Sequence, residues 1–482
     1  MTPTMPPVTD LLPLLPELWL VGAAFALLML DLFLDERHRG LTHWLSIAAL
    51  VATAALIGAG AGGQGTVLGG MFVRDTAADV LKFVTCVVSA LSLLYAWSFL
   101  RERGLYKGEV PVMVLFATAG MMLLVSAGSL VMVYLGLEML ALCSYALVAI
   151  DRDSPLASEA AIKYFVLGAL ASGMLLYGLS LTYGATGTLD LAGIREAIAL
   201  GGATPMLLTG MVFVVAGIAF KFGAAPFHMW LPDVYHGAPT PITLFIGSAP
   251  KLAAFGMAYR LLEAGVGPLD EQWRLLVAGL AVASLAIGNL IALMQANLKR
   301  LLAYSTISHV GFLFLGLAGG GAQGYAAAMF YAISYALMTT AAFGAIVVLA
   351  RRGFEADRIE DFKGLNARNP WMAGLVLCVM ASLAGVPPFL GFWAKLAVLR
   401  AALEGQMLWL AIVGVVFAVI GAFYYLKVVK AMYFDEPTVA EVAPRDDRAL
   451  QVAFGANALL LLVLGVFWNP IMAWCQYAFA GI

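Results

Sequence analysis

Long apolar stretches recur along the whole chain, and short stretches that contain charged residues, glycine or proline separate them. Each apolar stretch is near or above the ~20 residues that a helix needs to cross a bilayer. The pattern therefore predicts an all-α polytopic membrane protein with about fourteen transmembrane helices. The predicted spans are 15–35, 42–61, 76–99, 110–128, 129–150, 161–184, 206–232, 241–263, 273–294, 300–317, 324–349, 370–402, 408–432 and 450–474.

Two of these spans, 206–232 and 370–402, are overlong and contain glycine and proline near the middle. Their segments 223–227 and 385–389 share the pattern Gly-x-x-Pro-Phe and lie 162 residues, or five predicted helices, apart. Because five is odd, units related by this offset face opposite ways across the membrane, as in the inverted repeats of transporters. The alternative is a chance match in a chain that contains 50 glycines and 20 prolines.

The predicted repeats divide the chain into four parts, and each repeat is expected to contain one broken helix. A proline inside a helix removes an N–H donor and frees carbonyl groups, which are tolerated at membrane depth only where they line protein or water. The four parts are three N-terminal transmembrane helices (1–109), a first five-helix repeat (110–263), a second, inverted five-helix repeat (273–432), and a C-terminal loop with the last transmembrane helix (433–482).

Composition agrees with the membrane interpretation. Of the 482 residues, 62% are hydrophobic and only 12% are charged, whereas a soluble domain is typically about 25% charged. The net charge of −2 and the lack of a basic tract predict no nucleic-acid partner. The four cysteines are scattered through apolar stretches, which is typical of helix packing and not of a disulfide framework.

The basic residues predict the orientation of the helices. Seventeen of the 27 Lys and Arg residues, Arg37 and Arg445 among them, lie in one set of alternate loops. Five lie in the opposite set and five lie inside the predicted spans. Because cytoplasmic loops carry the excess of basic residues, both termini are expected on the outer side of the membrane.

Several ionisable residues lie inside the apolar spans: Glu138, Lys221, Lys251 and Lys395, with His309 just inside another span. A charge at this depth costs on the order of 3 kcal/mol, and such residues usually face a polar interior and act there. Lys251 is about ten residues, or ~15 Å of helix, from either end of its span, too far to reach water easily. A series of titratable groups at mid-membrane predicts movement of protons or ions.

Each candidate also has a purely structural interpretation. The structural alternatives are a static ion pair for Glu138 and Lys221, a fixed buried charge for Lys251, a counter-charge to freed carbonyls for Lys395, a side chain that reaches the surface for Lys163, and backbone or interhelical hydrogen bonds for His228 and His309. Lys82 and Asp31 lie nearer to helix ends and are assigned no role.

The chain contains no motif for redox or hydrolytic chemistry. Segments 58–63 and 319–324 match Gly-x-Gly-x-x-Gly, but neither belongs to a strand–turn–helix unit, so a nucleotide site is not expected. There is no P-loop, no His-Glu-x-x-His and no metal-ligand cluster in the sequence. Any energy for transport is therefore expected to come from partner proteins.

Two segments resemble the signatures of a known family. They are 227–241, Phe-His-Met-Trp-Leu-Pro-Asp-Val-Tyr-His-Gly-Ala-Pro-Thr-Pro, and 297–311, Asn-Leu-Lys-Arg-Leu-Leu-Ala-Tyr-Ser-Thr-Ile-Ser-His-Val-Gly. Both are similar to segments of the antiporter-like membrane subunits of respiratory complex I, the proton-pumping NADH–quinone oxidoreductase. The resemblance covers about 110–432. Cation/proton antiporters and membrane-bound hydrogenases share this core, so a component of a sodium/proton antiporter is the alternative function, and a structural membrane spacer is a third.

Three features indicate which type of subunit within this family the chain resembles. The chain ends after its last predicted span, whereas one type of subunit continues into a long lateral helix. It carries Lys395 where another type has glutamate, and its segment 383–392 resembles the remaining type.

The resemblance implies roles for particular residues. Glu138, Lys221, Lys251 and Lys395 match charged groups on the family's fifth, seventh, eighth and twelfth helices, and Lys163, His228 and His309 match further polar positions. A carboxylate beside a lysine favours the protonated lysine. Displacing Glu138 from Lys221 would then release a proton toward Lys251.

The resemblance also implies the surroundings of the chain. It is expected to be a subunit of a translocating enzyme and to have no redox centre, cofactor site or metal site of its own. FMN and iron–sulfur clusters are expected in partner subunits, and an antiporter-like subunit M and a small subunit K are the expected membrane neighbours. The expected location is the bacterial inner membrane, with both termini in the periplasm.

Overall fold

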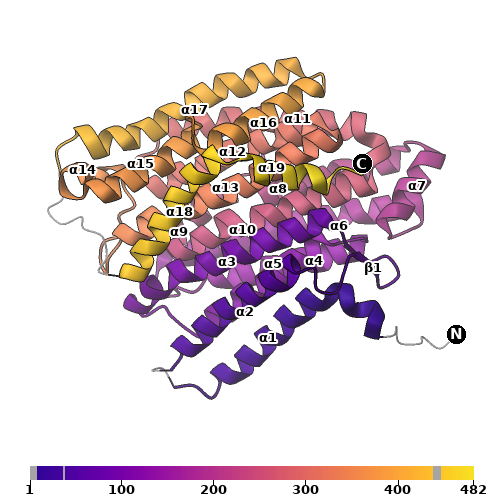
Figure 1. Cartoon of the computed structure of the whole chain (residues 1–482). Helices are drawn as coiled ribbons and strands as arrows, with labels where there is room; N and C mark the ends of the chain where they lie inside the picture. The colour runs from indigo at the N-terminus through magenta and orange to yellow at the C-terminus, as the bar shows by residue number, and fades with distance from the viewer. Residues whose placement is uncertain (1–7, 36–37, 438–446, 482) are drawn as a thin grey trace.

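Helices that lie side by side form a slab, with the connecting segments at its two faces (Figure 1). The computed structural model describes residues 8–35, 38–437 and 447–481, so Arg37 and Arg445 lie outside the described residues. The α-helices are α1 (Leu15–Asp31), α2 (Gly40–Gly58), α3 (Thr76–Glu102), α4 (Glu109–Val125), α5 (Leu130–Val148), α6 (Pro155–Thr186), α7 (Leu191–Gly201), α8 (Pro205–Phe222), α9 (Trp230–Gly237), α10 (Thr240–Tyr259), α11 (Asp270–Leu293), α12 (Leu298–Gly319), α13 (Gly321–Leu349), α14 (Leu365–Arg368), α15 (Pro370–Ala384), α16 (Leu390–Glu404), α17 (Leu408–Phe434), α18 (Arg448–Val466) and α19 (Asn469–Ala478). A π-helical segment, η2 (Arg260–Gly265), extends α10, and the 3₁₀ segments are η1 (Val8–Leu14), η3 (Gly267–Leu269) and η4 (Ile359–Phe362).

The helices agree with the predicted polytopic membrane fold. Twelve helical segments of the described chain are long and apolar enough to cross a membrane, and α4 and α15 are shorter apolar helices. The predicted total of fourteen crossings stays a prediction. In Figure 1, α7 and β1 lie at one face of the slab and α14 lies at the opposite face. We call these faces the outer and the inner side, following the predicted orientation.

Three elements differ from the sequence-based expectation. A hairpin of β1 (Gly65–Val67) and β2 (Phe72–Arg74) occupies the glycine-rich connection after α2. The short helix α7 was not predicted, because its 11 residues are too few to span a bilayer. The predicted span 450–474 is two helices, α18 and α19, since Pro470 can begin a helix but cannot continue one.

Polar residues at helix N-termini fix where the helices begin. Ser129 separates α4 from α5, and its Oγ accepts a hydrogen bond from the Met132 amide at 3.3 Å. This bond replaces a helical partner that the first turn lacks. The same kind of cap is made by Asp75, Ser154, Asp190, Thr204, Asn297, Asn369 and Asp447.

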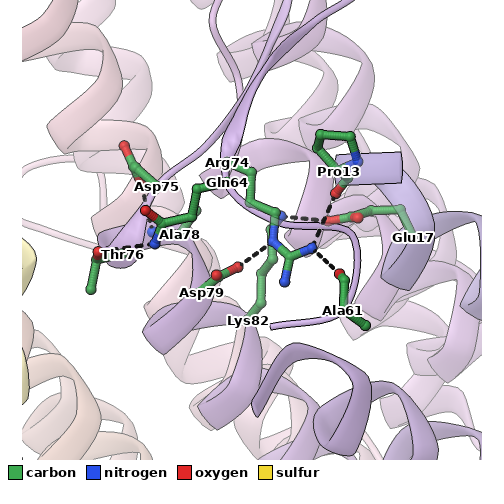
Figure 2. A network of polar contacts seen from close by, with 10 residues as sticks. All are labelled: Pro13, Glu17, Ala61, Gln64, Arg74, Asp75, Thr76, Ala78, Asp79 and Lys82. Atoms are coloured by element: carbon green, nitrogen blue, oxygen red, sulfur yellow. Dashed lines mark hydrogen bonds and ion pairs between the residues drawn. The ribbon is translucent and has the colours of Figure 1, made fainter. Parts of the chain in front are cut away.

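A buried charged network joins the N-terminal helices near the outer side (Figure 2). Lys82 Nζ on α3 lies 2.5 Å from Glu17 Oε1 on α1, and both side chains are buried. Beside them, Arg74 Nε donates to Asp79 Oδ1 at 2.7 Å. Removing one partner of a buried ion pair typically costs about 3–5 kcal/mol. Lys82 therefore has a partner that fits a structural role.

Candidate functional site

The two overlong spans are broken helices, as predicted. The helix α8 ends at Phe222, and α9 begins eight residues later at Trp230. The helix α15 ends at Ala384, and α16 begins at Leu390. Gly223 and Gly385 follow the first half-helix of each pair, with φ of 78° and 84°. This left-handed conformation favours glycine and ends the helix.

At the first break, a lysine binds the carbonyl that a proline leaves free. Pro226 has no N–H, so the Phe222 carbonyl four residues earlier cannot be paired by the helix. Lys251 Nζ donates to this oxygen at 2.7 Å. The lysine is on α10 and is 1% exposed. Its charge also faces the C-terminal end of α8, where the helix dipole is negative.

The second break repeats this arrangement with two prolines. Pro387 and Pro388 cannot donate to the carbonyls of Leu383 and Ala384. Lys395 Nζ donates to both oxygens, at 3.0 and 2.8 Å. Lys395 is buried and lies on α16, the second half of the same broken helix. The counter-charge geometry considered for Lys395 is thus present, and a proton-carrying role stays a prediction.

Glu138 on α5 and Lys221 on α8 line one cavity. Tyr145, Tyr164, Ser172 and Trp230 are among its other lining residues. Ser172 Oγ donates a hydrogen bond to Glu138 Oε1. Among the described residues, Glu138 and Lys221 form no ion pair within 4.0 Å. The arrangement brings the acid and the base to one space without locking them together.

Trp230 connects this cavity to Lys251. Its indole lines the Glu138–Lys221 cavity, and Lys251 Nζ lies 5.4 Å from the centre of the indole ring. The indole N–H donates to the Phe220 carbonyl at 3.1 Å, and Tyr164 stacks on the ring. The three predicted residues Glu138, Lys221 and Lys251 therefore lie around one fixed aromatic side chain.

His309 on α12 is the centre of a buried network of hydroxyl groups. Its Nδ1 lies 2.7 Å from the Tyr331 hydroxyl and its Nε2 lies 3.0 Å from the Tyr425 hydroxyl. The network continues through Ser305, Tyr424, Asn289 and Ser308. One helical turn beyond His309, the ring of Phe312 lies 5.1 Å from Lys395 Nζ. Both imidazole nitrogens are thus bonded between helices, by groups that can also pass a proton.

The other two predicted residues lie away from these contacts. Lys163 Nζ is 2.6 Å from Glu159 and 2.8 Å from Asp233, with its side chain 41% exposed. Asp233 also binds Arg300, so these residues form a charged cluster that is open to solvent. His228 is half-buried in the turn between α8 and α9, and its Nδ1 has no hydrogen-bond partner among the described residues.

Sequence reasoning missed several members of the site. Lys299 was assigned to an inner loop, but it is 5% exposed, and its Nζ donates to the Ala238 carbonyl at 2.7 Å. Asn289, Tyr331 and Tyr425 were overlooked inside apolar spans. A polar residue in such a span is a usable signal, but its partner comes from another helix and cannot be read from spacing.

Known proteins similar to this chain share both its length and its fold. The family model described as NADH:quinone oxidoreductase/Mrp antiporter, TM, matches residues 127–421. NADH-quinone oxidoreductase subunit N of Xanthomonas euvesicatoria pv. vesicatoria (strain 85-10) is 68% identical, with 100% of this chain and 99% of the relative covered. A chain of respiratory complex I from Thermus thermophilus with bound aureothin is 31% identical, with a TM-score of 0.81 over 95% of this chain and 98% of that chain. A chain of the Mrp complex from Dietzia sp. DQ12-45-1b shares the fold, with 24% identity and a TM-score of 0.80 over 100% of this chain and 97% of that chain.

Proposed function

The chain belongs to the family of NADH:quinone oxidoreductase/Mrp antiporter membrane subunits, and from this premise we propose how its buried residues carry protons. It is a proton-translocating membrane subunit of an NADH–quinone oxidoreductase, of the type named subunit N, as Lys395 and segment 383–392 indicated. The relatives favour this function over the sodium/proton antiporter alternative.

Protons pass along two connected groups of residues in this proposal. In the first, Glu138, Lys221 and Lys251 meet around Trp230. In the second, Lys395 lies 5.1 Å from the ring of Phe312, which is one helical turn from His309 on α12. Lys163 takes part at the inner surface and His228 at the first break. The observation that carries the proposal is that Lys251 and Lys395 both bind carbonyls freed by proline.

Because of this contact, the position of each lysine side chain depends on whether the lysine is protonated. A protonated lysine is a charged donor held by carbonyl oxygens at the negative end of a helix. A neutral lysine loses most of this attraction, so its side chain is free to turn toward the next acceptor. Each break thus supplies a local element with two states, which is what coupling between distant sites requires.

Glu138 is the proposed switch for the first group. It shares a cavity with Lys221 without an ion pair, so movement of the carboxylate toward the lysine can form the pair. When the carboxylate approaches, it favours the charged lysine, and when it withdraws, it favours release of the proton. Redox chemistry in partner subunits drives this displacement.

The surroundings of the chain complete the proposal. FMN and iron–sulfur clusters lie on partner subunits. Residues 8–35, 38–437 and 447–481 contain no group of three or more His, Cys, Asp or Glu side chains placed to hold a metal. An antiporter-like subunit M and a small subunit K are the proposed neighbours. The chain lies in the bacterial inner membrane with periplasmic termini, and segments 110–263 and 273–432 are the inverted repeats.

Lys251 provides the direct test. Lys251→Ala removes the proton carrier, whereas Lys251→Arg keeps a charge that cannot readily release its proton. Both variants should lose most proton uptake in sealed membrane vesicles while the complex still assembles. The measurement is proton uptake per NADH oxidised, with assembly checked on native gels. Full pumping by an assembled Arg variant would show that Lys251 is only a fixed charge.

A further inference from the structure

We propose that Lys299 is a proton-uptake residue, which takes protons from the inner side and passes them along buried hydroxyl groups to His309. The proposal rests on the proposed function, because it supplies the second group of residues with protons. Nothing in the sequence patterns assigns this role to Lys299, and only the fold shows that this lysine is buried.

Lys299 is buried although it lies in the first turn of α12. It is 5% exposed, and its Nζ donates to the Ala238 carbonyl, the C-terminal end of α9, at 2.7 Å. A cation at the N-terminus of α12 is unfavourable for that helix but favourable at the end of α9. Among the described residues it has no carboxylate within 4.0 Å. Lys299 therefore has the same carbonyl-bound geometry as Lys251 and Lys395.

The inner side of Lys299 is next to a titratable group. Asp357 is partly exposed in the loop after α13, and its carboxylate accepts from Asn297 Nδ2 at 2.7 Å. Its backbone carbonyl accepts from the Leu298 amide at 2.5 Å, which fixes the loop against the start of α12. Asp357 thus places a carboxylate at the surface, on a loop that is held against the start of α12.

The membrane side of Lys299 leads to His309 along one helix. Lys299 and Thr306 are seven residues apart on one face of α12, about 10 Å by helical rise. Tyr335 donates its hydroxyl to Thr306 Oγ1 at 2.7 Å, and its ring faces His309 with centres 5.0 Å apart. Tyr235, on the packed helix α9, adds a buried hydroxyl without a hydrogen-bond partner among the described residues. Hydroxyls of this kind can receive and pass on a proton.

Three substitutions separate a proton carrier from a structural cap. Lys299→Arg keeps the charge and the donor, Lys299→Gln keeps a donor without the charge, and Lys299→Met removes both. If Lys299 carries protons, all three should lower proton uptake per NADH at least about five-fold, while the Arg and Gln variants assemble. If it only caps α9, the Arg or Gln variant should pump normally, and that result overturns the proposal.

A control and a second variant complete the test. Lys427, an exposed lysine that donates to the Gln295 carbonyl at 3.4 Å, provides the matched substitutions Lys427→Arg and Lys427→Gln, which should pump normally. If no Lys299 variant assembles, Tyr335→Phe tests the route of buried hydroxyl groups instead. Unchanged pumping by this variant overturns the proposed route to His309. Normal pumping by Lys299 variants together with impaired Lys251 variants overturns this inference alone, whereas normal pumping by both sets overturns the proposed function.

Discussion

The two broken helices meet the same local need with lysines from different places. At the first break the cation is Lys251 on α10, a separate helix, and at the second it is Lys395 on α16, within the broken helix itself. The first break therefore ties α8 to α10, so a change at one helix is felt by the other. The second break instead ties α15 to α16, the two halves of the same broken helix.

The two breaks also differ in the ionisable and polar groups that lie near them. The first has Glu138 in the cavity that Lys221 lines. At the offset of 162 residues, Lys221 corresponds to Leu383, so the second break has no counterpart of this lysine. Around Lys395 the described residues offer the hydroxyl and imidazole network of His309 instead. From this difference we expect charge switching at the first break and proton relay through hydroxyl groups at the second.

The largest effect should follow from restoring backbone donors at the second break. The double substitution Pro387→Ala and Pro388→Ala lets the helix pair the carbonyls of Leu383 and Ala384, so Lys395 loses both partners. A hydrogen bond from a charged group is worth about 1.5–3 kcal/mol, so proton pumping should fall more than about ten-fold. Pro226→Ala removes only one carbonyl partner, that of Lys251, and should lower proton pumping less than the double substitution does. The readout is proton uptake per NADH in vesicles.

Two other prolines control for a general effect of proline removal. Pro370 and Pro205 lie in the first turn of α15 and α8, where the helix needs no N–H donor. Pro370→Ala and Pro205→Ala should therefore pump like the wild type. Equal losses in all four variants would mean that lysine–carbonyl contacts are not what the breaks provide.

Substitutions of Glu138 should have an intermediate effect on proton pumping, because they change only the first group of residues directly. Glu138→Gln removes the charge at similar size, so Lys221 should hold its proton less firmly and pumping should fall several-fold, on the order of 1 kcal/mol. Glu138→Asp keeps the charge and should pump better than the Gln variant. Vesicle proton uptake at matched assembly compares the two. Identical losses in both would show that charge at 138 is irrelevant.

The smallest effect is expected at Lys163, which has a solvent-exposed side chain. Its ion pairs with Glu159 and Asp233 are open to water, and exposed pairs contribute little. Lys163→Gln should therefore change proton uptake by less than about two-fold. A loss as large as that of Lys251→Ala would show that proton transfer depends on Lys163 as strongly as on Lys251.

The sequence by itself determined the membrane class, most of the helix spans and the two breaks. Apolar length decides whether a helix can cross a bilayer, and Gly223 and Gly385 with their prolines decide where it must break. These are local properties, so they can be read from neighbouring residues. It also singled out Lys251 and Lys395, since a lysine far from either end of an apolar span has no local explanation.

Only the tertiary structure decided what each buried charge contacts. Lys82 and Lys251 both lie in apolar spans, yet Lys82 meets Glu17 and Lys251 meets a backbone carbonyl. The predicted spans place Lys299 in a loop, but it lies in the first turn of α12 and binds the carbonyl at the end of α9. These partners are tens of residues away along the chain, and packing of whole helices sets their distances. Helical periodicity constrains which residues share a face, not which face of another helix they meet.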